Sequence, residues 1–285
     1  EAEKNNVVRQ QELLQIEKDN AERWLANALP EEVVRELKVN GKVEANAFDK
    51  VTVMFTDVVG FTSISRRMRP SRLVKRLDIL FRRFDELIQN NDLEKIKTIG
   101  DAYMCAGGIP IDNSINPMNA CIAALQIQDY MSKLKFDAIA NHSDYWEIRL
   151  GIHTGPVIAG IIGDLKLAYD IWGPTVNQAQ QMEKFGAPGE VTISGTTFTF
   201  IEPYFECIPK GKVKIKGGIE VDTYVVLKIK PELSEKGEGL FPNDKFSEIV
   251  ELHHFSPIKY YKTQHFVLDY LKAGLSDKLL YHSVN

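Results

Sequence analysis

Two aspartates stand where apolar runs of the chain end. Residues 51–58 are rich in β-branched and aromatic side chains, a composition typical of a buried strand, and Asp57 lies near the end of this run. Residues 95–106 contain the pair Gly100-Asp101 between two apolar-rich segments, and such pairs are favoured in tight hairpin turns. If the strands that carry them are neighbours, Asp57 and Asp101 lie at the same end of one sheet.

Two carboxylates that come this close repel each other unless a positive charge lies between them. Mg²⁺ commonly takes one or two carboxylates together with waters and substrate phosphates. A pair of metal ions can also clamp the attacking and leaving oxygens of a phosphoryl displacement. The backbone N–H groups of residues 59–63 lie at the start of a predicted helix, where anionic phosphates bind readily. Either aspartate alone could be a turn or cap residue, but the pair favours a metal site for phosphate chemistry.

Four segments of the chain resemble the motifs of the class III nucleotidyl cyclases. They read FTDVVGFTSIS at residues 55–65, EKIKTIGDAYM at 94–104, GIHTGPVIAGIIG at 151–163 and YDIWGPTVN at 169–177. The resemblance runs from about residue 48 to residue 227, in the order and at the spacing of the family. It implies an α+β fold with a ferredoxin-like core, in which helices pack on a mixed or antiparallel sheet. It also implies a homodimer or pseudodimer whose composite sites convert a nucleoside triphosphate into a cyclic nucleotide.

The resemblance also assigns the metal and phosphate ligands. Two Mg²⁺ or Mn²⁺ ions per site are expected at the carboxylates of Asp57 and Asp101 and at the backbone carbonyl of Val58. Such ions lower the pKa of the ribose 3′-hydroxyl, which attacks the α-phosphorus and releases pyrophosphate. Backbone contacts to the phosphates are expected from Val59, Gly60, Phe61 and Thr62.

By the same resemblance, Lys97 and Asp170 occupy the positions that read the base. Adenine offers an acceptor at N1 and a donor at its amino group, so a lysine and an aspartate match it. A glutamate and a small residue would match guanine instead. Because a buried polar group left unpaired costs about 1–3 kcal/mol, such a pocket discriminates strongly between the two bases. The pair therefore predicts ATP as the substrate. The alternative is that neither residue reads the base, and that Lys97 is an exposed strand lysine and Asp170 a loop carboxylate.

Three further positions are assigned in the same way. Asn177 resembles the residue that orients the ribose, and Lys216 resembles the lysine that meets the terminal phosphates. Gln181 stands where the family usually has an arginine. Glutamine carries no charge to stabilise the transition state, unless Lys184 substitutes for it. We therefore expect an adenylate cyclase of low basal activity. The alternatives are a guanylate cyclase and a catalytically weak or inactive nucleotide-binding domain that serves dimerisation or regulation.

Composition narrows the possible classes further. A net charge of −4 over 285 residues argues against a general nucleic-acid binder, which usually has a basic surplus. The three cysteines are widely spaced and form no metal-binding pattern, which favours a reducing compartment. No run of 18 apolar residues occurs, so we expect a cytoplasmic catalytic domain, although the parent protein could be membrane-attached.

The ends of the chain differ in composition from its middle. Residues 1–29 lack Gly and Pro, and Val7, Leu14, Ala21 and Ala28 fall seven apart, which predicts a coiled-coil-like signalling helix below an upstream sensor domain. A solvated helix is the alternative. We divide the chain into a stalk and linker at 1–46, a catalytic domain at 47–230, and a linker with a C-terminal helical extension at 231–285. That extension resembles the entry to an HD-type phosphohydrolase domain in its last residues, or it is an ordinary docking helix.

Periodicity places the remaining elements. Helices are expected at 70–91, 116–134 and 174–185, and strands at 190–194 and 212–227, the latter with a turn at Gly217-Gly218. Two strands at 146–154 and 156–162 are expected to form a hairpin around residues 153–155. His153 in this segment is expected to be a structural histidine.

Overall fold

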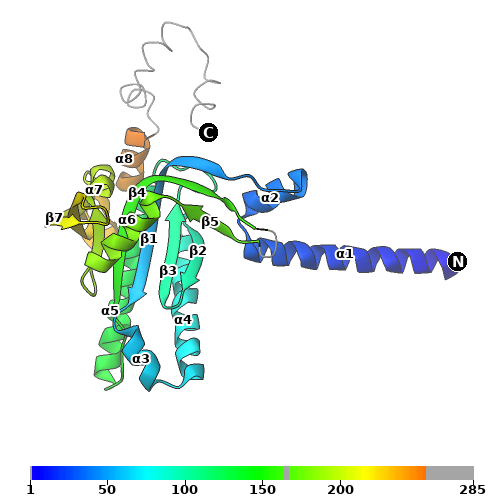
Figure 1. The fold of residues 1–285 in the computed structure, drawn as a ribbon, viewed down its shortest axis with the longest axis horizontal. Helices are drawn as coiled ribbons and strands as arrows, with labels where there is room; N and C mark the ends of the chain where they lie inside the picture. Colours follow the sequence, from blue (N-terminus) through cyan, green and yellow to red (C-terminus); the bar gives the residue numbers. More distant parts are fainter. Residues whose placement is uncertain (1, 164–166, 255–285) are drawn as a thin grey trace, which may run out of the picture.

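One mixed sheet forms the centre of the molecule (Figure 1). The computed structural model describes residues 2–163 and 167–254. Its eight strands follow the order β2-β3-β1-β4-β6-β8-β7, with β5 paired to β4, and all neighbours are antiparallel except β4 and β6. The strands are β1 (Asn46–Val58), β2 (Glu94–Ile99), β3 (Ala102–Gly107), β4 (Ile148–Ile161), β5 (Tyr169–Trp172), β6 (Val191–Ser194), β7 (Phe205–Lys214) and β8 (Glu220–Ile229).

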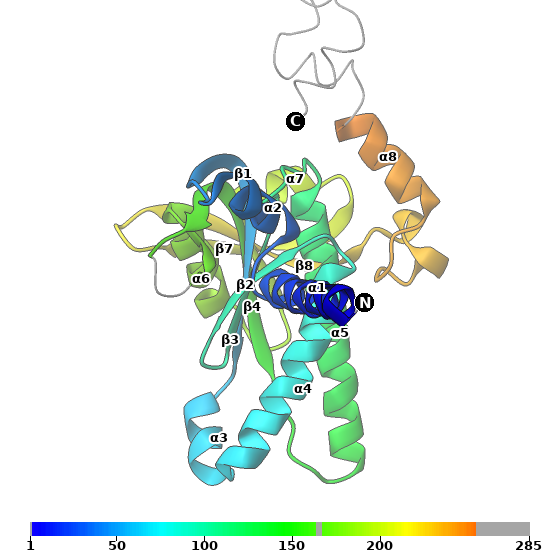
Figure 2. The same cartoon turned by 90° about the vertical axis from the view of Figure 1, so that its right-hand side faces the viewer.

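Helices cover both faces of this sheet, as the α+β prediction requires (Figure 2). They are α1 (Ala2–Ala28), α2 (Glu31–Asn40), α3 (Phe61–Arg67), α4 (Pro70–Gln89), α5 (Asn116–Ala140), α6 (Pro174–Phe185), α7 (Gly195–Ile201) and α8 (Asp244–His254). Two short 3₁₀ helices, η1 (Pro231–Leu233) and η2 (Glu235–Gly237), precede α8. Among the described residues, no helix is both long enough and apolar enough to cross a membrane.

The first apolar core lies between the sheet and the neighbouring helices α4 and α5. The predicted apolar stripe of α4 supplies Leu80, Phe84, Leu87 and Ile88, which are all buried. Their removal from water is the main favourable term that holds the helix on the sheet. From β1, Met54 and Val58 point into this same core.

The second core lies on the opposite face, beneath α2 and α6. It receives Val51, Val53 and Phe55 of β1, together with Val34 of α2 and Ala179 of α6. Because side chains alternate along a strand, the residues of β1 that point into this core have odd numbers. Asp57 therefore lies on the α2/α6 face at the end of β1.

The prediction of a hairpin around residues 153–155 is wrong, because this segment lies inside the long strand β4. Residues 153–155 do not form a hairpin; the chain runs straight through them, and β4 pairs with β1 from Ile148 to Ala159. Gly155 was placed in that hairpin, but both it and Gly151 lie under α6. An added Cβ would lie 1.9 Å from the Glu183 nitrogen at Gly151 and 2.6 Å from the Thr175 hydroxyl at Gly155. The glycines let the helix approach the sheet closely.

The C-terminal side of the catalytic region also differs from the expected pattern. Residues 231–245 resemble a linker in composition, yet Leu233 is buried, and Phe246 of α8 packs against Tyr204 and Phe205. The strand pair β7–β8 begins earlier than expected, at Phe205, with the predicted turn between the strands. The helix expected after residue 266 lies outside the described residues.

The predicted N-terminal helix is present as α1, which projects from the body of the molecule (Figure 1). Val7, Leu14 and Trp24 are exposed on it. Its C-terminal end is anchored where Leu25 and Leu29 pack in the α2/α6 core. A coiled-coil partner for this helix remains a prediction.

Candidate active site

The two predicted metal-binding aspartates lie together. Asp57 is the penultimate residue of β1 and lies on the α2/α6 face, and Asp101 occupies the turn between β2 and β3, where β3 is the neighbour of β1. Burial, followed by the nearby Asp57 carboxylate, raises the pKa of Asp101, while backbone hydrogen bonds from Asp101 and Val58 oppose the rise. The two carboxylates thus lie close enough to repel each other, which is the condition that favours a cation bound between them.

A cation that the sequence reasoning missed lies beside these acids. Arg149 is the direct cross-strand partner of Asp57, so their side chains share one face of the sheet. Its Nη2 donates a hydrogen bond to Asp57 Oδ2 at 2.9 Å. On the other side, its Nε lies 2.9 Å from Glu183 Oε1 in an ion pair without hydrogen-bond geometry. Only the register between β1 and β4 could have indicated the contact with Asp57.

Glu183 is nearly completely buried, with 4% of its surface exposed. Burial raises its pKa, and the Arg149 guanidinium lowers it in opposition. Removing a carboxylate from water is costly unless it is paired, so Arg149 is the group that makes this burial tolerable.

The turn after Asp57 leads directly into α3, as expected for a phosphate-binding segment. Ser63 and Ile64 donate their backbone N–H groups to the Gly60 carbonyl, which closes the first turn. The Val59 N–H already donates to the Glu147 carbonyl at 2.9 Å. Of the predicted phosphate contacts, Gly60, Phe61 and Thr62 therefore keep backbone donors that have no acceptor within the described residues.

The two predicted base-reading residues are in contact. The Lys97 ammonium group forms a salt bridge with Asp170 Oδ2 and joins β2 to β5. The other oxygen of Asp170 accepts a hydrogen bond from the Ile171 N–H at 2.8 Å. Both side chains stay accessible, at 40% and 21% exposure. A donor and an acceptor therefore stand side by side, close to solvent, at the edge of the sheet.

The predicted ribose and phosphate residues lie on two elements. Asn177 and Gln181 are one turn apart on α6, which begins with Pro174 as expected, and Asn177 is exposed. Lys184 is exposed on the same helix. Lys216 is exposed in the turn between β7 and β8, and among the described residues no ion pair joins it to the aspartates.

His153 is a structural residue, as predicted. It is buried in β4, where its Nδ1 lies 2.7 Å from the Ser194 hydroxyl. Burial lowers its pKa to about 4, so the imidazole is neutral at physiological pH.

The site contains few donors for a metal beyond the two aspartates. Within residues 2–163 and 167–254, no cluster of three or more His, Cys, Asp or Glu side chains could hold a metal ion. This donor set still suits Mg²⁺ or Mn²⁺, because such ions accept one or two carboxylates and complete their shell with carbonyls, water and substrate phosphates.

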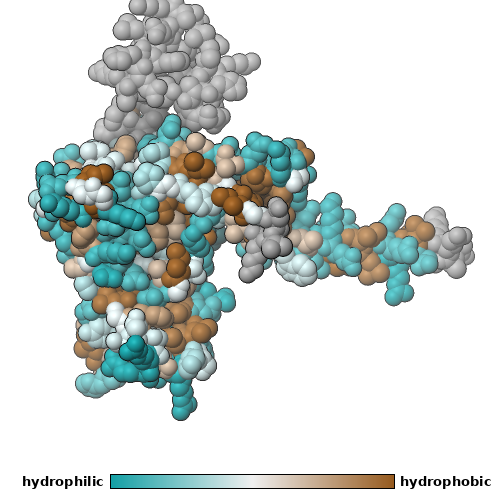
Figure 3. Space-filling model, viewed as in Figure 1, coloured by the Kyte–Doolittle hydropathy of each residue, from teal (hydrophilic) through white to brown (hydrophobic). Residues whose placement is uncertain are grey.

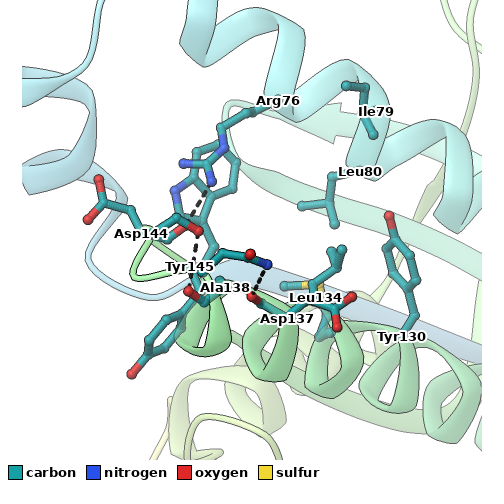
Figure 4. A pocket seen from close by; sticks show the side chains of 13 residues that line it. Arg76, Ile79, Leu80, Tyr130, Leu134, Asp137, Ala138, Asp144 and Tyr145 are labelled. Carbon is teal, nitrogen blue, oxygen red and sulfur yellow. Dashed lines mark hydrogen bonds between the residues drawn. The ribbon is translucent and has the colours of Figure 1, made fainter.

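A separate pocket of about 340 Å³ lies between α4 and α5 (Figure 4). Leu80, Tyr130 and Leu134 line its apolar walls, and Arg76 lies over the Trp146 ring, 5.2 Å from its centroid. None of the predicted site residues lines this pocket. The candidate active site is thus the open surface between Asp57, the β2–β3 turn and α6.

Comparison with protein families decides the identity of the fold. Residues 43–228 match the model of the adenylate and guanylate cyclase catalytic domain. The chain belongs to this family. Its arrangement of sheet and helices accordingly matches solved cyclase domains.

The family's curated members include proteins with clear similarity to this chain. It is 36% identical to the soluble guanylate cyclase subunit beta-2 of Rattus norvegicus, over 75% of this chain and 31% of that protein. It is 35% identical to guanylyl cyclase C of Homo sapiens, over 75% of this chain and 20% of that protein. The chain thus spans a third or less of the length of these relatives.

Solved structures of two cyclases share the fold. The guanylate cyclase domain of RhGC from Catenaria anguillulae, in complex with GTP, is 31% identical with a TM-score of 0.59, over 64% of this chain and 98% of that one. The adenylyl cyclase CyaB from P. aeruginosa is 27% identical with a TM-score of 0.62, over 69% of this chain and 100% of that one. The family therefore establishes a nucleotidyl cyclase domain, and the base is left to the residues of the site.

Proposed function

We propose that this chain is an adenylate cyclase that converts ATP into 3′,5′-cyclic AMP and pyrophosphate. The observation that carries the proposal is the contact between Lys97 and Asp170, which presents a donor beside an acceptor at the sheet edge. Lys97 would donate to adenine N1, and Asp170 would accept from the 6-amino group. Without a nucleotide, the Lys97 ammonium and the Asp170 carboxylate are paired with each other. The adenine of ATP would insert between them and replace the salt bridge with two hydrogen bonds.

The remaining residues divide the work on the ribose and the triphosphate. Asn177 would orient the ribose so that its 3′-hydroxyl faces the α-phosphorus. Gly60, Phe61 and Thr62 would donate backbone N–H groups to the phosphates, and Lys216 would meet their terminal end. Two Mg²⁺ or Mn²⁺ ions held by Asp57, Asp101 and the Val58 carbonyl would supply charge stabilisation and acidify the 3′-hydroxyl.

A guanylate cyclase is the second candidate. The relatives described above are named as guanylate cyclases, and one solved structure is itself in complex with GTP. A further similar structure, 33% identical, is a rhodopsin-guanylyl cyclase with converted specificity in complex with ATPαS. The fold therefore accommodates either purine. We favour ATP because Lys97, at the position assigned to N1, can only donate a hydrogen bond. Adenine N1 accepts such a bond, whereas the N1–H of guanine needs an acceptor.

We place the active site at the interface of a homodimer. In the cyclase family, the metal-binding acids and the base-reading pair of one site come from opposite protomers. The arm formed by the end of β4 and by β5 supports this arrangement, because Ile158, Ile162 and Leu167 are exposed on or beside it. Figure 3 shows apolar residues gathered on this side of the molecule. Burial of such side chains would favour association.

Complementation between two inactive variants tests the shared site. An Asp57→Ala chain lacks a metal ligand, and an Asn177→Ala chain lacks the ribose contact. Each should be inactive alone, whereas their mixture should regain one intact site per heterodimer. A mixture as inactive as its components would refute a site shared between protomers.

Gln181 leaves open a catalytically weak or inactive role. A neutral amide cannot stabilise developing phosphoryl charge as a guanidinium does, and loss of one such group commonly costs about 10²–10³ in rate. Such a chain would serve as a nucleotide-binding dimerisation or regulatory domain. Intact Asp57, Asp101 and Asn177 favour slow catalysis instead.

The deciding experiment is a cyclisation assay with ATP and GTP side by side, in Mg²⁺ and in Mn²⁺. We expect slow formation of cyclic AMP from ATP, and formation of cyclic GMP from GTP at a small fraction of that rate. Preferential turnover of GTP would select the guanylate cyclase. Nucleotide binding without pyrophosphate release would select the regulatory domain.

We further propose how the domain is connected. Residues 47–230 would form the catalytic domain in the cytoplasm, and the stalk at 1–46 would carry the signal of an upstream sensor through a paired α1. Anchoring of α1 by Leu25 and Leu29 in the α2/α6 core supports such a coupling, because α6 packs on that same core.

A further inference from the structure

The acidic end of the sheet holds three carboxylates and one guanidinium. Asp57, Asp101 and Glu183 are the acids, and Arg149 bridges Asp57 and Glu183 at 2.9 Å on each side. The two contacts differ in kind. Nη2 makes a directed hydrogen bond to Asp57, whereas Nε faces Glu183 by charge alone. Arg149 is therefore shared between a carboxylate of the proposed metal site and one that has no part in metal binding.

Glu183 cannot leave this position easily. It lies near the C-terminal end of α6, and the backbone of Met182 and Glu183 rests directly on Gly151 of β4. Its side chain is 6% exposed, while those of Arg149 and Asp57 are about one-third and one-quarter exposed, at 32% and 27%. The buried carboxylate is thus the fixed partner of Arg149, and Asp57 is the partner that solvent or a ligand can reach.

A cation that binds Asp57 must compete with the guanidinium already hydrogen-bonded to it. If Asp57 were the only partner of Arg149, release of the carboxylate would leave the guanidinium unpaired in a partly desolvated site. Charge-assisted hydrogen bonds of this kind are among the strong ones. Because Glu183 also attracts Arg149, the arginine keeps a counter-charge when Asp57 turns to a metal ion.

We propose that Glu183 is a positioning residue that holds Arg149 and thereby frees the Asp57 carboxylate for a divalent cation. The inference rests on the metal site of the proposed function. It also has a structural consequence, since Glu183 lies two residues beyond Gln181. The metal-binding end of β1 and the helix with the nucleotide-orienting residues are then joined through one guanidinium.

Mn²⁺ binding tests this role without any need for turnover. Free Mn²⁺ is measured by electron paramagnetic resonance during titration of the full chain, with 3′-deoxy-ATP and 3′-deoxy-GTP in parallel, because neither can cyclise at the 3′ position. The Asp57→Asn variant should lose tight Mn²⁺ binding, and the binding that it loses is then assigned to the proposed metal site. Glu190→Gln is the matched control, because Glu190 pairs with Lys210 and faces none of the three acids.

The two key variants should shift the affinity in opposite directions. Glu183→Gln keeps the size of the side chain but leaves Arg149 to Asp57 alone, so Mn²⁺ should bind about tenfold more weakly, as expected for a change in one neighbouring charge. Arg149→Met removes the competitor, so Mn²⁺ should bind more tightly although the chain is less stable. The double variant should return toward the wild-type affinity and recover stability, since neither charge remains buried without a partner.

A purely structural role gives a different pattern. If Glu183 only stabilised α6, both single variants would lower the melting temperature and shift Mn²⁺ affinity in the same direction or leave it unchanged, and either result overturns the proposal. If Arg149→Met does not fold, an unchanged affinity in Glu183→Gln overturns it alone. A wild-type chain that binds Mn²⁺ as described but forms no cyclic nucleotide refutes the proposed function and leaves this inference standing.

Discussion

Replacement of Gly151 by alanine tests whether the contact between β4 and α6 positions the site. A Cβ at this position would lie 1.9 Å from the Glu183 nitrogen, 2.4 Å from the Met182 carbonyl carbon and 2.5 Å from the Glu183 Cα. All three are backbone atoms, so no side-chain rotation relieves the clash. Ordinary contacts begin at 3.4 Å, and the helix must therefore retreat by about 1.5 Å.

This displacement has two measurable consequences. Overpacking of this kind costs about 1–3 kcal/mol, which corresponds to a fall of about 2–12 °C in melting temperature for a domain of this size. Asn177 and Gln181 move with the helix, and a misplacement of about 1 Å can lower a rate about 100-fold. We expect both effects in Gly151→Ala, measured by thermal unfolding and by cyclic nucleotide formation.

The matched control is Gly195→Ala. Gly195 is the first residue of α7, and its nearest atom, Asp222 Cβ, lies 3.3 Å from an added Cβ. This variant should melt within a few degrees of the wild type and keep its activity. If Gly151→Ala also behaved like the wild type, the close approach of α6 to β4 would not position the site, and the explanation for this glycine would be wrong.

Three further predictions concern the substrate, the rate and the effect of pH. Gln181→Arg should raise the cyclisation rate, by up to about 10²–10³, because it restores a cation near the transition state. Combined replacement of Lys97 by glutamate and Asp170 by serine should shift turnover from ATP toward GTP, since the new pair matches guanine. Burial, with Glu32 nearby, raises the pKa of Glu94 to about 7, so its protonated form favours the fold. The wild type should lose stability between about pH 4.5 and pH 7, and Glu94→Gln should lose less over that range.

Each of these predictions can fail in a recognisable way. An unchanged rate in Gln181→Arg would mean that position 181 does not face the reacting phosphate. A Lys97 and Asp170 double variant that keeps its preference for ATP would remove these residues from base recognition. Parallel melting temperatures for the wild type and Glu94→Gln from pH 5 to pH 8 would show that Glu94 titrates normally.

Much of the architecture follows from local patterns of residues. The apolar stripe of α4, the helix that begins at Pro174 and the turn at Gly100-Asp101 all lie where periodicity and turn chemistry predict them. These features depend on neighbours within one or two turns of the chain, and such neighbours are visible in the order of the residues. The four motifs at residues 55–65, 94–104, 151–163 and 169–177 were together sufficient to recognise the family.

Long-range contacts decided the rest, and β4 shows why. A glycine favours a turn and also permits close approach of another backbone, and the two cases look alike in a sequence. Gly155 was assigned to a hairpin, whereas α6, from a later part of the chain, fills the space above it and above Gly151. Arg149 meets Asp57 across 92 residues of sequence, because the antiparallel register places them opposite each other. The order of residues predicts which groups can react, but the register of strands and the packing of α6 determine which charges share the site.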